Sequence, residues 1–168
     1  MTDSRETDTP HLPGSDVGAA PNLQIVAQYL KDLSFENYNA PQSLMQSGEA
    51  PQIEVSVDLE AQTLADDLYE VELTITATAE RDDQKVFLVE VVYSGLFQIQ
   101  NVDEAALRPV CLIECPRLLF PFARRIIADA TRDGGFPPLL VDPIDFFRLY
   151  RERFGDGAEE GEADGPAD

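Results

Sequence analysis

The stretch Y-E-V-E-L-T-I-T-A-T-A (69–79) decides the fold, because apolar and polar side chains alternate along its whole length. Its odd-numbered positions are apolar, and its even-numbered positions carry glutamate or threonine. A period of two residues is typical of a strand that has one face on a core and the other in water. The segment therefore predicts an antiparallel sheet with one polar face.

Neighbouring segments extend this sheet. Residues 53–59 alternate isoleucine, valine or leucine with glutamate, serine or aspartate. An earlier segment has apolar residues at odd positions, namely Leu23, Ile25, Ala27, Tyr29, Leu33 and Phe35. Asp66-Asp67 and R-D-D-Q-K (81–85) are typical of turns. Three strands and two turns are therefore predicted before residue 86.

The next strand is apolar on both faces. Val86, Leu88 and Val92 point to one side, and the residues between them to the other: Phe87, Val89, Val91 and Tyr93. A strand of this kind needs cover on both faces. In a chain of 168 residues, we expect another subunit to supply the second cover. The pattern predicts an oligomer in which Val89, Val91 and Tyr93 help to form subunit contacts.

The second half of the chain has a helical pattern. Leu119, Phe122, Ile126 and Ala130 recur at the spacing of one helix face. Pro116 suits the start of this helix and Gly134-Gly135 its end. Further elements are a helix over 104–114, an extended connector F-P-P-L-L-V (136–141), and a helix over 143–154 capped by Asp142-Pro143. The fold class is therefore α+β.

Charge is unevenly distributed along the chain. The net charge is -20, from 32 acidic and 12 basic residues. Residues 21–104 hold 16 acids and three bases, whereas residues 105–155 hold six acids and eight bases. An acidic half disfavours nucleic acid and favours a basic partner. The polar ends 1–20 and 156–168 are predicted to be disordered, around one domain over 21–155.

Signals for export, membrane insertion or catalysis are missing from the sequence. No apolar run is long enough to span a bilayer, and the first residues do not resemble a signal peptide, which predicts a cytoplasmic protein. His11 is the only histidine, and Cys111 and Cys115 are expected to be buried helix residues. We therefore expect no enzyme, no metal and no cofactor, but an acidic, oligomeric binding protein.

Four segments resemble the SecB family of protein-export chaperones, and they occur in the family's order between Asn22 and Phe154. They are K-D-L-S-F-E-N-Y-N-A-P (31–41), L-A-D-D-L-Y-E-V-E-L-T-I-T-A-T-A (64–79), L-F-P-F-A-R (119–124) and G-G-F-P-P-L-L-V-D-P-I-D-F-F-R-L-Y (134–150). The resemblance implies a four-stranded antiparallel Greek-key sheet packed with helices, assembled as a homotetramer that is a dimer of dimers. It also implies ATP-independent binding of non-native precursor proteins and their delivery to the motor protein SecA.

The resemblance also implies site residues. Asp32, Glu36, Leu88 and Glu90 match the positions where the family contacts the basic, zinc-containing C-terminal segment of SecA. Exposed apolar surface is needed to hold unfolded clients, and prolines keep such surface from acting as a strand edge. The candidates for a client groove are Phe35, Tyr38, Phe97, Phe136, Leu139 and Leu140, with burial in the protomer core as the alternative for each.

Two other functions are left open by the sequence. One is a SecB-like adaptor, or antitoxin-associated chaperone, that serves a single dedicated partner. The other is a small enzyme whose site is assembled across subunits. Delayed aggregation of several unrelated unfolded proteins without nucleotide would favour general export over either alternative.

Overall fold

The computed structural model describes residues 18–155, and the two predicted disordered ends lie largely outside this range. Four antiparallel strands form one sheet in the order β1-β4-β3-β2. The strands are β1 (Asn22–Asn37), β2 (Gln52–Ala65), β3 (Leu68–Arg81) and β4 (Gln84–Gln100). Hairpins join β2, β3 and β4, while β1 lies beside β4 and reaches β2 by a long connection. This is the Greek-key arrangement that the resemblance implied.

Both hairpin turns form at the pairs of aspartates that the sequence places between the predicted strands. Asp66 and Asp67 separate β2 from β3, and Asp82 and Asp83 separate β3 from β4. Asp82 and Asp83 both have positive φ, 52° and 59°. Two consecutive residues with positive φ match the right-handed twist of the strands that they join. The predicted turns are therefore confirmed.

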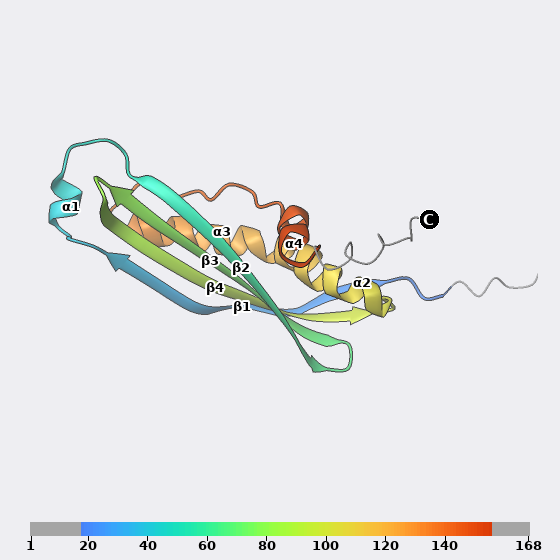
Figure 1. Ribbon diagram of the computed structural model, residues 1–168. Helices are drawn as coiled ribbons and strands as arrows, with labels where there is room; N and C mark the ends of the chain where they lie inside the picture. Colours follow the sequence, from blue (N-terminus) through green and yellow to red (C-terminus); the bar gives the residue numbers. More distant parts are fainter. Residues whose placement is uncertain (1–17, 156–168) are drawn as a thin grey trace, which may run out of the picture.

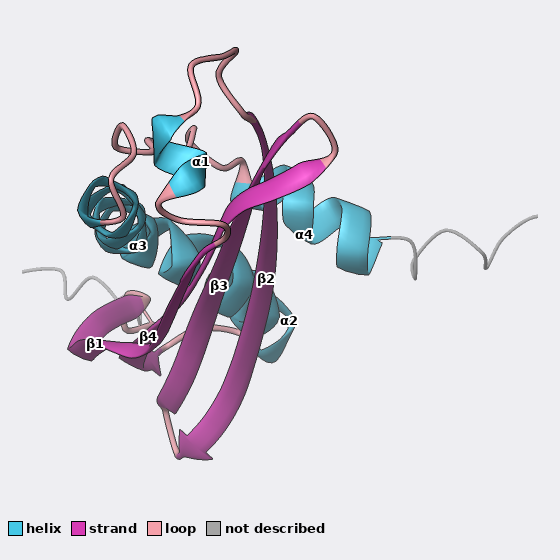
Figure 2. Cartoon of the chain, turned by 90° about the vertical axis from the view of Figure 1, so that its left-hand side faces the viewer, coloured by secondary structure: helices cyan, strands magenta, loops and turns pink. Residues whose placement is uncertain are grey.

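Within the described residues, helices cover only one face of the sheet (Figures 1 and 2). The covered face carries the odd-numbered side chains of β3 and β4, and nearly all of them are buried. Val71, Leu73 and Ile75 are fully buried there, as the alternation predicted. The other face carries the acidic and threonine side chains, and we call it the open face. Within residues 18–155, no helix has the length and apolar character needed to cross a membrane.

The helical half differs from the prediction at two points. Instead of two separate helices, α2 (Glu104–Pro109), the π-helical η1 (Val110–Glu114) and α3 (Cys115–Asp133) follow one another without a break. Proline lacks a backbone N–H, and the wider π turn between Pro109 and Pro116 lets the helix adjust rather than end. The predicted end at Gly134 is confirmed.

The last helix, α4 (Phe146–Phe154), begins later than predicted. Asp142-Pro143 does not cap it. Asp145 is the N-cap, since its side chain accepts a hydrogen bond of 3.0 Å from the N–H of Arg148. Residues 137–145 form the irregular connector between α3 and α4, as expected for a proline-rich segment.

Strand β1 also departs from the simple alternation. Its register against β4 shifts between Ile25 and Ala27 and again between Leu30 and Asp32. Each extra residue reverses the faces of the side chains that follow it. Ala27 and Tyr29 therefore pair with even-numbered residues of β4 and lie on the open face, contrary to the prediction.

Candidate functional site

An apolar groove lies where the proline-rich connector meets the sheet. It has a volume of about 360 Å³, and most of its walls are apolar, coming from the connector, β4 and the start of β2. Thr131 fixes the connector, because its hydroxyl accepts the N–H of Leu139 at 2.9 Å and its carbonyl accepts the N–H of Phe136 at 3.1 Å. The groove residues are Ala50, Pro51, Ile53, Arg81, Phe87, Phe136, Pro137, Pro138 and Leu139.

Two aromatic rings line this groove, those of Phe87 and Phe136, and the ring of Phe35 packs against Phe87. The ring of Phe87 stacks on that of Phe35, with centroids 5.9 Å apart, and lies 4.9 Å from that of Phe136. The sequence predicts Phe35 and Phe136 for the groove but not Phe87, whose ring contacts both of them. The only sequence feature that indicated Phe87 was its place on the second apolar face of β4.

Other groove candidates fall in different places. Leu139 lines the groove and is half-buried, while Leu140, the next residue of the connector, is 63% exposed and is not one of the groove residues. Tyr38 lies toward the acidic surface, since its hydroxyl donates to Glu36 at 2.5 Å and this bond raises the pKa of Tyr38. Phe97 was predicted for the groove, but it is fully buried beneath α3 and belongs to the core.

Gly95 explains why Phe97 is inaccessible. A Cβ at this position would lie 2.5 Å from the ring of Phe97 and 2.9 Å from Leu119 of α3. The helix therefore approaches the sheet closely above Gly95, and the Phe97 ring fills the space beside it. A client could not reach Phe97 without separating α3 from the sheet.

The open face brings together the four residues predicted to bind SecA. Glu36 is paired with Leu88 across β1 and β4, and Ser34 is paired with Glu90, so these side chains share one face. Asp32 is paired with Val92 and lies on the same face. Asp32 and Glu36 are exposed, whereas Leu88 and Glu90 are half-buried. Thr76 donates to Glu90 at 3.0 Å and holds its carboxylate.

In another part of the open face, a lysine partly offsets the negative charge. Lys31 donates to Glu70 at 2.5 Å and to Glu72 at 2.7 Å, which ties β1 to β3 above the small, buried Ser94 of β4. The hydrogen bond from Lys31 lowers the pKa of Glu70, mainly because it stabilises the charged carboxylate. Asp32 and Glu36, by contrast, are exposed and lie on the same face.

The predicted subunit-contact residues need correction. Val89 and Val91 are fully buried on the covered face, and Tyr93 is 7% exposed. They contact the chain's own helices, with the ring of Tyr93 stacked on that of Phe122. In this conformation, a second subunit cannot contact Val89 or Val91. The prediction failed because the strand's two apolar faces do not reveal which one the helices cover.

Exposed apolar side chains lie elsewhere, at the β1 side of the covered face. Leu30 pairs with Tyr93 across the strands, and Phe122 of α3 stacks on that same tyrosine. We group Leu30 and Phe122 with the other exposed apolar side chains of β1 and α3, and we call the set the β1–α3 surface. Its members are between 40% and 52% exposed: Ile25, Val26, Leu30, Leu33, Leu118 and Phe122.

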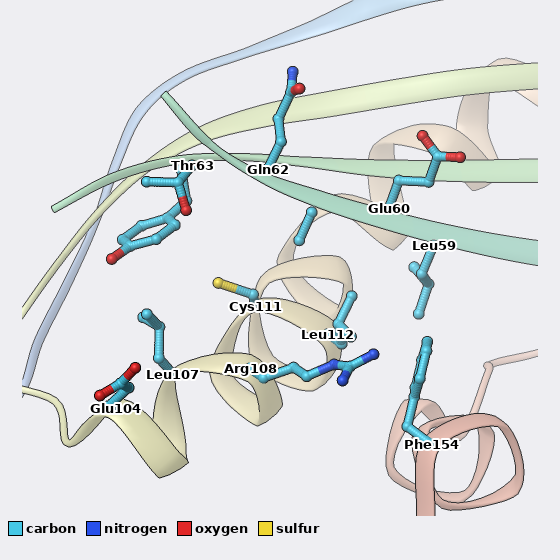
Figure 3. Close-up of a pocket in the computed structure, with 12 residues that line it drawn as sticks. Leu59, Glu60, Gln62, Thr63, Glu104, Leu107, Arg108, Cys111, Leu112 and Phe154 are labelled. Atoms are coloured by element: carbon cyan, nitrogen blue, oxygen red, sulfur yellow. The ribbon is translucent and has the colours of Figure 1, made fainter. Parts of the chain in front are cut away.

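The two cysteines are free thiols buried in the helical layer, as predicted. The neighbouring Cys111 thiol, together with burial, raises the pKa of Cys115. Cys111 lines a second recess, of about 550 Å³, between β2 and the helix that starts at Glu104. Figure 3 shows this recess.

Comparison with known proteins identifies the family. The family model for SecB, the preprotein translocase subunit, matches residues 16–156. The protein-export protein SecB of Maricaulis maris is 54% identical over 146 residues, covering 86% of this chain and 85% of that protein. SecB of Afipia carboxidovorans is 48% identical over 160 residues, covering 95% and 99%. The chain therefore belongs to the SecB family of protein-export chaperones.

A solved structure shares the fold. It is the SecB-like chaperone of Mycobacterium tuberculosis in complex with a peptide from the HigA1 antitoxin, with a TM-score of 0.60 and 16% identity. The match covers 73% of this chain and 90% of that one. Because the much more similar relatives are export proteins, the alternative of a dedicated antitoxin partner is not favoured. SecB is a chaperone family, so the enzyme alternative is set aside.

Proposed function

We propose that this chain holds non-native precursor proteins in the cytoplasm, without ATP, and delivers them to SecA. The observation that carries the proposal is the separation of two chemically different surfaces. An apolar groove with the exposed Leu140 lies by the connector, and free carboxylates lie on the open face. A client in the groove leaves the carboxylates accessible to a second protein.

The groove suits unfolded clients for a physical reason. Its apolar walls can bury client side chains, at about 25 cal/mol per Å² of apolar area removed from water. Pro137 and Pro138 cannot donate backbone hydrogen bonds, so this part of the wall does not offer an edge for uncontrolled strand pairing. We expect Phe136, Leu139 and Leu140 to contact clients.

The open face suits the basic C-terminal segment of SecA. Asp32, Glu36 and Glu90 supply negative charge, and Leu88 supplies an apolar contact among them. Complementary charge of this kind speeds association and is weakened by salt. The zinc in this segment belongs to SecA, so this chain supplies only the complementary surface.

Assembly into a homotetramer would cover the β1–α3 surface. Several exposed large apolar side chains on β1 and α3 are a liability unless a partner buries them. We expect a second copy to contact Leu30, Leu33 and Phe122, in place of the buried Val89 and Val91.

A pair of variants tests the delivery step. Changing Asp32, Glu36 and Glu90 together to lysine should lower the affinity for SecA at least tenfold, while suppression of client aggregation stays intact. The matched control changes Glu104, Asp133 and Asp142 to lysine, which alters the net charge equally but on exposed positions of the helical half. Equal SecA affinity in wild type and the first variant would show that the open face does not bind SecA.

A further inference from the structure

Strand β2 is the outer strand of the sheet opposite β1, and it is 14 residues long. Within residues 18–155 it pairs only with β3, so half of its backbone N–H and C=O groups point away from the sheet. Such an edge can accept an extended peptide as an additional strand. The groove lies at its beginning, since Pro51 and Ile53 line that groove. A client held there would reach the free edge directly.

Arg153 interrupts this edge near its middle. One guanidinium nitrogen donates to the Asp58 carboxylate at 2.6 Å, and the other donates to the backbone carbonyl of Val57. Helix α4 packs on the covered side, whereas Asp58 points to the open face through its pairing with Thr74. The guanidinium must therefore pass around the outside of β2 to reach both groups. Figure 2 shows α4 at this side of the sheet.

The position of Arg153 is set by the packing of α4. Phe146 at its start is only 2% exposed, and Asp145 caps that end. At the other end, the Arg108 guanidinium of α2 lies 4.5 Å from the ring centroid of Phe154. Both ends of the short helix are thus attached to the body of the protein. This attachment holds Arg153 against β2.

Beyond the arginine, the edge continues to the second recess. Its lining includes Leu59, Gln62, Leu107 and Phe154, and Figure 3 shows Leu59 and Phe154 facing each other at one side. Two apolar hollows therefore lie along one strand, with Arg153 between them.

We propose that Arg153 sets how far a bound client extends along β2. This role rests on the proposed function. A client that enters from the groove pairs with residues 52–56 of β2 and stops at Val57. Displacement of Arg153 would let the client continue along β2 toward Ala65 and place side chains in the second recess. The arginine would then determine the length of client segment that the chaperone holds.

Hydrogen–deuterium exchange of β2 amides tests this, with a reduced and carboxymethylated globular protein as the client. In the wild type, the client should protect amides within residues 52–57 and leave 59–65 unchanged. In Arg153→Ala, protection should extend through 59–65. Client affinity should rise about tenfold, because the longer paired segment adds hydrogen bonds and one or two of them have a net effect of about this size. Asp58→Asn keeps the arginine but removes the charge of its carboxylate partner, so the protected part of β2 should extend in the same direction. Arg151→Ala is the control, because Arg151 lies over Phe147 instead.

Three results would overturn the inference. They are an unchanged boundary in both Arg153→Ala and Asp58→Asn, protection of all of β2 in the wild type, and bound client without any protection of β2. Failure of the wild type to suppress client aggregation is a different outcome, because it would remove the proposed function itself.

Discussion

Leu140 and Phe97 allow a direct test of which apolar residues serve clients and which stabilise the fold. Both were candidates for the client groove, but Leu140 is 63% exposed and Phe97 is fully buried. A fully buried leucine contributes about 1.5–3 kcal/mol. With about two fifths of the side chain buried, Leu140→Ser should cost roughly 0.6–1.2 kcal/mol of unfolding free energy. Its melting temperature should fall by only a few degrees.

Phe97→Ala should behave in the opposite way. The ring is enclosed by the core and by Leu119 above Gly95, so its removal leaves a cavity. Removing a buried phenylalanine in this way costs about 3–5 kcal/mol. The melting temperature should fall by about 10 °C or more. Below that temperature, client holding by the folded protein should be unchanged.

The assay measures thermal unfolding and suppression of client aggregation on the same preparations. Leu64→Ser is the matched control, since Leu64 is 49% exposed but lies at the far end of β2 from the groove. Leu140→Ser should reduce aggregation suppression several-fold, and Leu64→Ser should not. The reasoning is refuted if Leu140→Ser holds clients as well as the wild type does, or if its melting temperature falls as far as that of Phe97→Ala.

Three further predictions concern packing, pH and assembly. Gly95→Ala should lower stability by about 1–3 kcal/mol in denaturant unfolding, because its Cβ would collide with Phe97 and Leu119; unaltered stability would contradict the close packing of α3. Lys31 lowers the pKa of Glu70, so this ion pair stabilises the folded state at neutral pH. The stabilisation decreases below about pH 4.3, the pKa of glutamate in the unfolded chain, and it is lost once the pH has fallen through the lowered pKa of Glu70 in the folded protein. Lys31→Met should therefore melt earlier than wild type at pH 7 and equally at pH 2.5, and a difference that persists at pH 2.5 would assign the effect to packing. Leu33→Glu should shift tetramers toward smaller species in native mass measurements, whereas Leu64→Glu should not; an intact tetramer would exclude the β1–α3 surface as an interface.

Local patterns predicted the sheet well. The alternation over β3 and the aspartate turns report interactions between residues close in sequence, so they identified strand faces and hairpins directly. The choice of face on β4 is different. Val89 and Leu88 are both apolar, and only the position of α3 decides which one is buried. That position depends on long-range packing, which a period of two cannot reveal.

Helix boundaries show the same distinction. Asp142-Pro143 and Asp145 are both acceptable starts, and the structure uses Asp145, whose carboxylate accepts the N–H of Arg148. A start at Asp145 leaves room for Phe146 to be buried against Phe120, 6.2 Å away between ring centroids. Capping chemistry alone could not choose between the two aspartates.

The two irregularities in β1 decide which of its side chains reach the open face. Each adds one residue against β4, so the first reverses the strand's faces and the second restores them. Asp32 and Glu36 therefore lie on the open face, as simple alternation predicted, although the stretch between the irregularities is reversed. That reversal puts Tyr29 beside Glu70, and the second extra residue, Lys31, reaches Glu70 and Glu72. The irregularities therefore place one lysine among the carboxylates of the open face, while Asp32 and Glu36 stay exposed on the same face.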